Sequence, residues 1–460
     1  MSDSPQNEAQ DNADLPAGLL AWLSEEFSGN ITRMERHVAR REAWVVDITQ
    51  SDGSVIEGFL RIDRAPRENS TVSLRREAEI CRVLPELGIP VPALLGWNEP
   101  HHAALFSRVQ GRADIHNLKD TEQQRKVMED FIDIIARLHQ IDAGSLGVDE
   151  HLGDKPDTPA RCALDDLDRQ LSSFASFVEH YVDPLMTYSV QWLRRHVPKQ
   201  VDRVCLVQGD TGPVNFMFEG NKVTAIVDWE WGHWGDPMED LGNICVRELW
   251  NPSGGLTGLF KRYEQASGIP YNRFAAQYYR IQQNVRGMIP IHAACKHMPP
   301  GQSYAWYLCY RYLGDRTTCE ALADAMDIAI ERPSMPDDSK KSVISRAAVA
   351  HIHSDIMPAV DTPIAQSRAD DIVILIECME RQQRFGDQLK SIECQEISQL
   401  LDTQINDFNS ALKQLNDAIL AERLDDKALI PYLARKAYRD EWLHWPVTRL
   451  YPDRVWSALD

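Results

Sequence analysis

The stretch QGDTGPVNFMFEGNKVTAIVDWE, residues 208–230, places three polar side chains at fixed offsets: Asp210, Asn215 and Asp228. Two short apolar runs lie between Asn215 and Asp228, separated by a Glu-Gly-Asn turn, which predicts a β-hairpin. Because antiparallel pairing joins the entry of a hairpin to its exit, Asn215 and Asp228 are expected at one end of the ribbon, close to Asp210. Such a set of oxygen ligands suits Mg²⁺ with a nucleotide phosphate and a hydroxyl to be activated.

Each of the three residues also has a simpler interpretation. Asp210 could accept hydrogen bonds within a loop turn, Asn215 could be a turn residue, and Asp228 could cap a helix after the strand. Taken alone, each residue favours the simpler role. The three together, followed by GDPMEDL at 235–241, favour a site that handles phosphate.

The composition is that of a globular protein with more than one domain. At 460 residues the chain exceeds one ordinary hydrophobic core, so two or three domains are expected. Hydrophobic residues make up 43% and charged residues 26%, which is typical of soluble proteins. The formal charge of 49 − 69 = −20 argues against nucleic acid as a partner, because phosphate backbones bind basic surfaces.

The cysteines and the lack of long apolar runs indicate a cytoplasmic protein. Nine scattered cysteines without a C-x-x-C pair fit reduced, mostly buried thiols better than disulfides or a zinc site. No apolar run approaches the ~20 residues that cross a bilayer, so no membrane partner is expected. Residues 1–16 are acidic and lack both parts of a signal peptide, which indicates a disordered leader.

Upstream of the hairpin, the sequence predicts a small β-rich lobe over residues 17–109. Strand-forming residues predict strands at 43–48, 55–62 and 103–109. A helix is expected at 72–87, because its apolar positions recur at helical spacing and two prolines follow it.

Downstream, helical periodicity dominates residues 110–330, apart from the hairpin itself. A polar, proline-bearing break at 331–338 predicts a linker. Beyond it, residues 339–460 are expected to form a helical domain, in which apolar residues from Ile397 to Ile419 follow a 4,4,3,4,3,4 spacing. That spacing predicts one helix with a narrow apolar seam, packed within the chain or across a homodimer.

Arg61 and Glu77, sixteen residues apart, form a second candidate pair. Arg61 ends a predicted strand and Glu77 lies on the next predicted helix, so the cation could reach the carboxylate and be directed toward a phosphate. Glu77 also fits an ordinary solvated run of charges at 75–79. The order of the elements favours the pair: strand cation, helix carboxylate, edge strand, helical region, Asp-x4-Asn and strand-end Asp follow the order of a kinase-type phosphotransferase.

Together these motifs resemble those of the aminoglycoside phosphotransferase family, small-molecule kinases similar in fold to protein kinases. The QGDTGPVN segment is similar to the family's His-Gly-Asp-x4-Asn, and DWE at 228–230 to its metal-binding Asp segment. GDPMEDL at 235–241 resembles its Gly-Asp-Pro-x-x-Asp-Leu, and LHQID at 138–142 its Leu-His-x-x-Asp. The resemblance covers roughly residues 30–330, and its finer likeness is to kinases associated with acyl-CoA dehydrogenases.

The resemblance implies an α+β, protein-kinase-like two-lobe fold, with a small β-rich N-lobe, a helical C-lobe and, here, an added all-α C-terminal domain. Asp210 would accept or orient the proton of the substrate hydroxyl. Asn215 and Asp228 would bind Mg²⁺ between the β- and γ-phosphates of ATP or GTP. Arg61 would contact phosphate, oriented by Glu77.

Further residues are implied around the nucleotide and beneath the catalytic loop. Arg40 and Arg41 would lie over the nucleotide, and Ser107 and Val109 would flank the hinge against the adenine. Structural support for the loop would come from Gln208, Asp236 and Asp240.

Three departures from the family pattern bear on activity. Gln208 replaces the usual His at a position that supports the loop, so the chemistry is expected to remain. Arg61 stands where many members have Lys, and the two residues bind phosphate differently. The segment 39–44 that would cover the nucleotide has no glycine, so Arg40 or Arg41 would serve in place of a close backbone approach.

The leading expectation is a kinase that transfers the γ-phosphate of ATP or GTP to a small-molecule hydroxyl. The acceptor would be a hydroxyacyl-CoA, another hydroxy acid or an aminoglycoside-type antibiotic. The alternative is a catalytically weak pseudokinase that binds nucleotide as an interaction protein. Gln208, Arg61 and the glycine-free segment favour it, and the retained Asp210, Asn215 and Asp228 oppose it. A metal-dependent hydrolase fits less well, because no further cluster completes a two-metal site.

Overall fold

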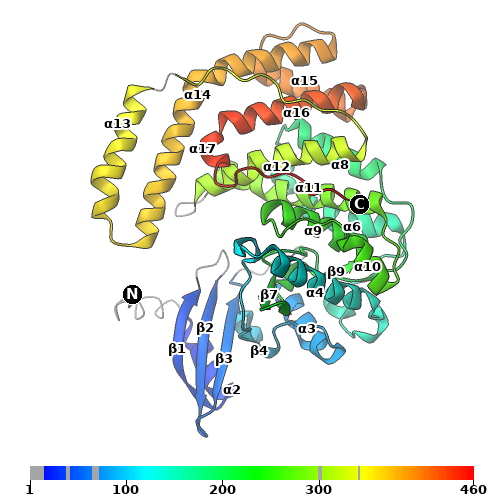
Figure 1. The fold of residues 1–460 in the computed structure, drawn as a ribbon, viewed down its shortest axis with the longest axis vertical. Helices are drawn as coiled ribbons and strands as arrows, with labels where there is room; N and C mark the ends of the chain where they lie inside the picture. The colour runs from blue at the N-terminus through cyan, green and yellow to red at the C-terminus, as the bar shows by residue number, and fades with distance from the viewer. Residues whose placement is uncertain (1–14, 38–41, 65–71, 299–302, 340–341, 460) are drawn as a thin grey trace. The chain divides into compact units, whose positions relative to one another are not determined.

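The computed structural model describes residues 15–37, 42–64, 72–298, 303–339 and 342–459. Nearly all of the predicted leader, and both Arg40 and Arg41, lie outside these residues. The chain divides into two compact units (Figure 1). The first comprises Met1–Arg169, Lys199–Arg273 and Ser457–Asp460, and the second Gln170–Pro198 and Phe274–Trp456.

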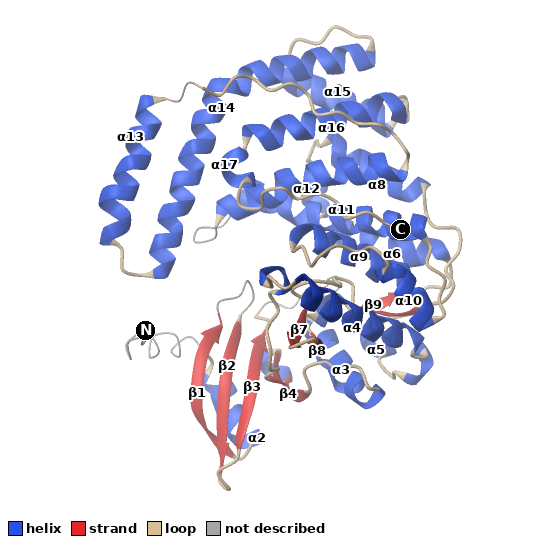
Figure 2. Ribbon diagram, viewed as in Figure 1, coloured by secondary structure: helices blue, strands red, loops and turns tan. Residues whose placement is uncertain are grey.

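The first unit contains a five-stranded antiparallel sheet with strand order β1-β2-β3-β5-β4. Figure 2 shows β1, β2 and β3 side by side. β2, β3 and β5 match the three predicted strands. β1 and β4 were not predicted, because β1 is polar and largely exposed and β4 has only 5 residues. The strands are β1 (Gly29–His37), β2 (Ala43–Gln50), β3 (Val55–Ile62), β4 (Leu94–Asn98) and β5 (Ala103–Ser107).

Alternating apolar residues attach this sheet to helix α2 (Ala17–Glu26). Trp44, Val46 and Ile48 of β2 lie on one face, because successive side chains of a strand point to opposite faces, and all three are fully buried. They form one core cluster with Leu19 and Leu23 of α2. This core fixes the sheet that carries Arg61.

Helix α3 (Leu74–Val83) presents Glu77. Ser73 caps the helix by accepting a hydrogen bond from Arg76 N (3.3 Å). A 3-10 turn follows α3 and ends at Gly88, which adopts a left-handed φ of 75°. The helix predicted at 72–87 is therefore confirmed, with its last turn tightened.

Helices make up most of the remaining first unit. α4 (Thr121–Gln140) packs against α10 (Leu259–Ser267), and its Phe131 stacks on Phe216 of the hairpin, with 4.5 Å between the ring centroids. The predicted hairpin is present as β7 (Phe216–Glu219) and β8 (Lys222–Ile226). The other elements are α5 (Asp149–Leu152), α6 (Pro159–Ser173), β6 (Cys205–Val207), β9 (His233–Gly235), which pairs with β6, and α9 (Pro237–Trp250).

The second unit contains only helices and loops over its described residues. α12 and α16 pack on each other, and the hydroxyl of Tyr438 donates to Glu320 (2.9 Å) between them. Helices from both sides of residues 331–338 thus belong to this unit; the domain limits expected from the sequence stay predictions. The helices are α7 (Ala175–Val178), α8 (Pro184–Arg195), α11 (Arg273–His297), α12 (Tyr304–Ala325), α13 (Val343–His351), α14 (Pro363–Leu401), α15 (Phe408–Leu420), α16 (Asp426–Leu443) and α17 (Trp445–Thr448).

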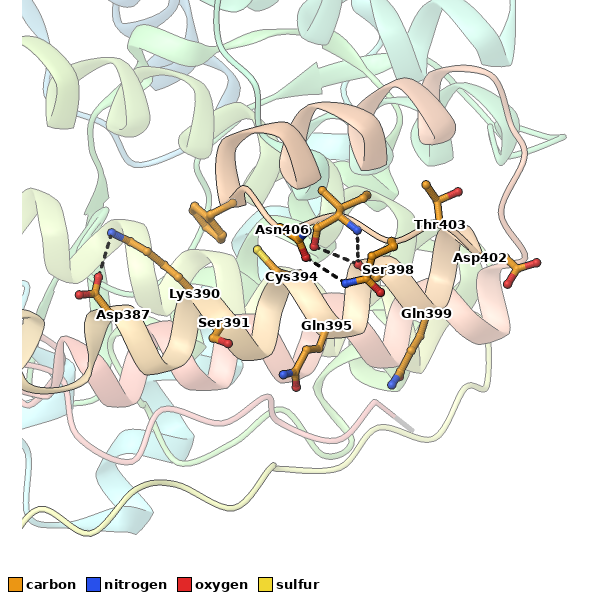
Figure 3. A pocket seen from close by; sticks show the side chains of 13 residues that line it. Asp387, Lys390, Ser391, Cys394, Gln395, Ser398, Gln399, Asp402, Thr403 and Asn406 are labelled. Carbon is orange, nitrogen blue, oxygen red and sulfur yellow. Dashed lines mark hydrogen bonds and ion pairs between the residues drawn. The ribbon is translucent and has the colours of Figure 1, made fainter.

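The single helix predicted from Ile397 to Ile419 is wrong, because two helices share that span. α14 ends at Asp402, which has a left-handed φ of 48°, and Asp407 caps α15 by accepting from Ser410 N (2.7 Å). A hollow of about 690 Å³ lies along the connecting loop (Figure 3), and none of the predicted site residues lines it. Packing across a homodimer stays a prediction.

All nine cysteines are buried thiols outside any disulfide. Cys81, Cys162, Cys205 and Cys245 lie in the first unit, and the second contains Cys295, Cys309, Cys319, Cys378 and Cys394. None of the helices that the structure describes combines the length and the apolar character needed to cross a membrane.

Candidate active site

The hairpin brings Asn215 and the residue before Asp228 into direct contact. Val227 N donates to Asn215 O (2.9 Å), as antiparallel pairing of the two ends requires. Asp228 then adopts a left-handed φ of 62°, which is uncommon for a residue other than glycine, and the 3-10 turn η5 (Trp229–Trp231) follows. The Asp228 side chain makes no capping hydrogen bond to this turn, so the simpler interpretation as a helix cap is wrong.

Arg61 of β3 contacts carboxylates from three segments. Its Nη1 donates to both oxygens of Glu77 (2.7 Å each) and to Asp228 Oδ1 (3.2 Å), and its Nη2 donates to Glu230 Oε2 (3.0 Å). The predicted contact between Arg61 and Glu77 is therefore present. Burial lowers the pKa of Arg61, but attraction to Glu77, Asp228 and Glu230 outweighs burial and raises that pKa above its ordinary value.

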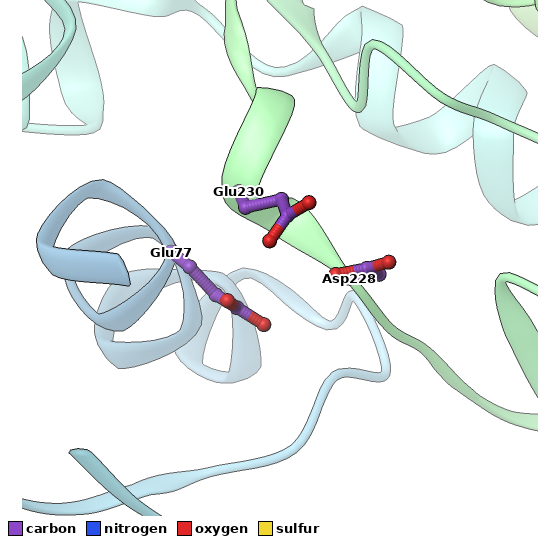
Figure 4. Close-up of side chains that lie close together, drawn as sticks. All are labelled: Glu77, Asp228 and Glu230. Atoms are coloured by element: carbon purple, nitrogen blue, oxygen red, sulfur yellow. The ribbon is translucent and has the colours of Figure 1, made fainter. Parts of the chain in front are cut away.

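The three carboxylates around Arg61 form a compact group of oxygen donors (Figure 4). Glu77 comes from α3, Asp228 follows β8, and Glu230 lies in η5; one oxygen from each lies within 4.8 Å of the others. Together with Arg61, these side chains carry a formal charge of 1 − 3 = −2. Carboxylate oxygens are the ligands that Mg²⁺ prefers, and Asp228, whose side chain is 39% exposed, is the member of this group that is accessible to a divalent cation.

Asp210 lies on the loop before the hairpin, and Asn215 and Arg247 both bind its carboxylate. Asn215 Nδ2 donates to the Asp210 carbonyl oxygen (2.7 Å) and to its Oδ2 (3.1 Å). Arg247 of α9 donates from Nε to Oδ1 (2.8 Å) and from Nη2 to Oδ2. The side chains of Asp210 and Arg247 are 18% and 24% exposed, so this pair borders solvent.

Gln208 connects the loop to the exit of the hairpin. Its buried side chain donates from Nε2 to the carbonyl oxygens of Val227 (3.0 Å) and Asp228 (2.8 Å). Its Oε1 accepts from Asp210 N (2.8 Å). One amide thus supports both Asp210 and Asp228, which agrees with the supporting role implied for this position.

Asp240 of α9 fixes the backbone of the same loop. Its carboxylate accepts from Gln208 N (3.0 Å), Gly209 N (3.1 Å) and the Thr211 hydroxyl, and His139 Nε2 of α4 lies 3.0 Å from its Oδ2. Burial raises the pKa of Asp240, but the hydrogen bonds from His139 and Thr211 outweigh burial and hold that pKa below its ordinary value. The carboxylate is therefore suited to hold backbone N–H groups.

Asp236, Ser107 and Val109 are the remaining predicted site residues that the structure describes. Asp236 caps α9 by accepting from Met238 N (3.0 Å), which is a structural role. The Ser107 hydroxyl, at the end of β5, accepts from Ala93 N (2.9 Å), and Val109 is half-buried two residues later. Among the contacts that the structure describes, neither hinge residue reaches Asp210 or Arg61.

Glu230 and Arg247 contact the site residues, but the sequence motifs gave neither of them a role. Glu230 follows the motif Asp by two positions, and its bond to Arg61 depends on how η5 packs against α3. Arg247 follows Asp240 by seven positions, which places both on one face of α9. That spacing was the available signal, but it indicates a shared face without indicating what the face meets.

The fold and these clusters define a protein-kinase-like phosphotransferase. The model of the phosphotransferase enzyme family matches residues 37–278, more than half of the chain, and the chain belongs to this family. The resemblance drawn from the motifs and the expectation of a phosphotransferase that acts on an alcohol group are confirmed.

Curated relatives match the chain over about half of its length. Acyl-CoA dehydrogenase family member 11 of Rattus norvegicus is 25% identical over 229 residues, covering 47% of this chain and 28% of the relative. Family member 10 of Mus musculus is 27% identical over 236 residues, covering 48% of this chain and 21% of the relative. The match thus spans less than a third of either relative.

One solved structure supports the fold directly. A Ralstonia eutropha protein assigned as an aminoglycoside phosphotransferase aligns with a TM-score of 0.53 and 19% identity, covering 67% of this chain and 97% of that chain. The predicted fold class, a β-rich N-lobe with a helical remainder, is confirmed.

Proposed function

We propose that this small-molecule phosphotransferase transfers the γ-phosphate of ATP, or of GTP, to an acceptor hydroxyl. The observation that carries the proposal is one continuous series of contacts. Asp210 is bound by Asn215, Asn215 pairs with the strand end that leads into Asp228, and Asp228 is bound by Arg61, which Glu77 holds. The residues proposed as proton acceptor, metal ligands and phosphate-binding cation are thus joined by consecutive contacts.

Each residue has a role in this proposal. Asp210 accepts or orients the proton of the acceptor hydroxyl. Asn215 and Asp228 hold Mg²⁺, which when bound supplies charge neutralisation at the β- and γ-phosphates. Arg61, fixed by Glu77, contacts phosphate. The residues proposed to surround the nucleotide are Arg40, Arg41, Ser107 and Val109.

A hydroxy acid or a hydroxyacyl-CoA is the acceptor that we propose, in preference to an aminoglycoside. An aminoglycoside is polycationic and requires an acidic surface around the reacting hydroxyl, whereas Arg247 pairs with Asp210 and offsets the negative charge of that carboxylate. The names of the two curated relatives, acyl-CoA dehydrogenase family members, also support an acyl-CoA-related acceptor.

A γ-phosphate transfer screen tests this function. Radiolabelled ATP and GTP are incubated with Mg²⁺ and a library that contains hydroxy acids, hydroxyacyl-CoAs and aminoglycosides. Asp210→Ala is expected to lower transfer by at least about 10³-fold, because it removes the group that receives the proton. Asp228→Ala is expected to abolish transfer and Mg²⁺-dependent nucleotide binding together.

Asp157→Ala serves as the matched control, because Asp157 is an exposed carboxylate paired with Arg161 (3.4 Å). Full turnover in Asp210→Ala or Asp228→Ala would overturn the proposal. Nucleotide binding without transfer to any acceptor would support the nucleotide-binding interaction protein instead.

A further inference from the structure

Arg247 is the charged side chain that binds Asp210 from α9, and the motifs of the chain assign it no role. Its guanidinium meets the carboxylate with two nitrogens, Nε on Oδ1 (2.8 Å) and Nη2 on Oδ2. A two-nitrogen contact of this kind fixes the plane of a carboxylate as well as its position. Asn215 reaches only Oδ2 of the side chain (3.1 Å), and a contact with a single nitrogen does not fix a plane.

Arg247 and Asp240 act on the same loop from one face of α9. Asp240 accepts from the backbone of Gln208 and Gly209, and Arg247, two helical turns later, donates to the Asp210 side chain. The helix therefore determines both the path of the loop and the orientation of its carboxylate.

Gly212 provides independent support that α9 and the loop are fitted to each other at Arg247. A Cβ at Gly212 would lie 2.6 Å from Arg247 Cβ and 3.3 Å from Ile244 Cα, and Gly212 has a φ of +139°. Only glycine allows the loop to approach the arginine stem so closely in that backbone conformation. The site thus includes a residue that makes space for Arg247.

We propose that Arg247 is a positioning residue of the transfer reaction, which holds the Asp210 carboxylate in the orientation that receives the acceptor hydroxyl. This inference rests on the proposed function of Asp210. Positioning acts on the chemical step, so Arg247 is expected to change kcat and leave the KM for ATP nearly unchanged.

The test compares Arg247→Gln and Arg247→Lys with the wild type in Mg·ATP turnover, using water and the best acceptor from the screen. Arg247→Gln is expected to lower kcat about 10- to 100-fold, with the KM for ATP changed less than about 2-fold. Arg247→Lys, which keeps the charge without the planar fork, is expected to restore part of the loss. Arg262→Gln is the control, because Arg262 forms a similar two-nitrogen pair with Asp133 (2.8 and 2.6 Å) elsewhere in the first unit.

A double-mutant cycle separates positioning from general support of the fold. If Arg247 acts through Asp210, Arg247→Gln lowers turnover in the wild type and causes no further loss in the Asp210→Ala background. An equal loss in both backgrounds, or wild-type kcat in Arg247→Gln, would overturn the inference while leaving the proposed function intact. A wild-type chain without any transfer would instead overturn the proposed function. Should Arg247→Gln fail to fold, the kcat and KM of Arg247→Lys decide the question.

Discussion

The guanidinium of Arg61 joins a strand of the N-lobe to a helix, a strand end and a 3-10 turn. Glu77, Asp228 and Glu230 accept from two different nitrogens of the same side chain. A lysine ammonium has one nitrogen on a flexible stem and cannot present two nitrogens in one plane. An arginine at this position can therefore bind Glu230 in addition to Glu77, because Glu230 accepts from the second nitrogen.

Arg61→Lys is expected to raise the KM for ATP about 10-fold, because the ammonium cannot keep the contacts of both nitrogens and loses its fixed direction toward phosphate. Steady-state kinetics with varied ATP measures the change. Arg82→Lys is the control, since Arg82 is half-exposed and pairs with Glu79 (2.8 Å) outside the cluster. An unchanged KM for ATP in Arg61→Lys would show that the two guanidinium nitrogens are not needed for nucleotide binding.

Local rules made some of these residues predictable and left others hidden. Asn215 and Asp228 could be placed together because a hairpin of known length joins them, and Arg61 and Glu77 because a strand and the next helix carry them. Arg247 and Asp210 are 37 positions apart, and Glu230 and Arg61 are 169 apart. Those contacts depend on how α9 and η5 pack, which no local pattern specifies.

Among the elements, the loop of residues 208–215 packs closely against helix α9. A substitution at Gly212, which lies at this contact, tests how closely the two are packed. Gly212→Ala places a Cβ 2.6 Å from Arg247 Cβ and forces an unfavourable φ. Gly220→Ala also meets a positive φ (+56°) but has no atom within 4 Å.

We expect Gly212→Ala to lower the free energy of unfolding by about 2 kcal/mol more than Gly220→Ala, because both variants strain the backbone and only one creates a clash. Urea unfolding measures both values. Equal losses of unfolding free energy in the two variants would mean that α9 shifts to accommodate the added methyl group.

The break between α14 and α15 shows why element boundaries resist prediction from apolar spacing. Ile405 lies in the connecting loop and is nevertheless buried, with its N–H donating to the Ser398 hydroxyl (3.1 Å). The apolar spacing therefore continues through a loop, and a pattern of 4,4,3,4,3,4 cannot distinguish a continuous helix from two helices that share one core. The polar residues Asp402 and Asp407 were the local signals of the break.

At the scale of the whole molecule, the second unit contains a buried charged centre that makes its stability depend on pH. His292 of α11 is fully buried; Nε2 lies 2.9 Å from Asp315 Oδ1, and Nδ1 lies 2.9 Å from the Tyr181 hydroxyl and 3.5 Å from Asp183 Oδ2. Burial lowers the pKa of His292, but Asp315 and Asp183 outweigh burial and raise it to about 9. Arg311 also acts on Asp183 and Tyr181, Lys436 acts on Asp183, and Lys296 lies over the Tyr181 ring.

Because the folded pKa is raised above the ordinary value of 6.5, His292 stabilises the fold fully below that value, and the stabilisation is lost as pH rises through about 9. The contribution is on the order of 3 kcal/mol. Urea unfolding between pH 6 and about 8.5, below the range in which the unfolded thiols titrate, is expected to show most of this loss, and His292→Gln to reduce it. A pH-independent wild type in this range would contradict the assignment.

The buried cysteines report the opening of each unit separately. Burial raises the pKa of Cys205 in the first unit and of Cys319 in the second well above the ordinary value, so a maleimide reacts with either thiol only after the surrounding structure opens. Labelling rates, followed at each cysteine by mass spectrometry, therefore time the opening of the two units independently in one unmodified chain. A nucleotide that binds the first unit would slow the labelling of Cys205, which lies just before the loop of residues 208–215, in proportion to its occupancy.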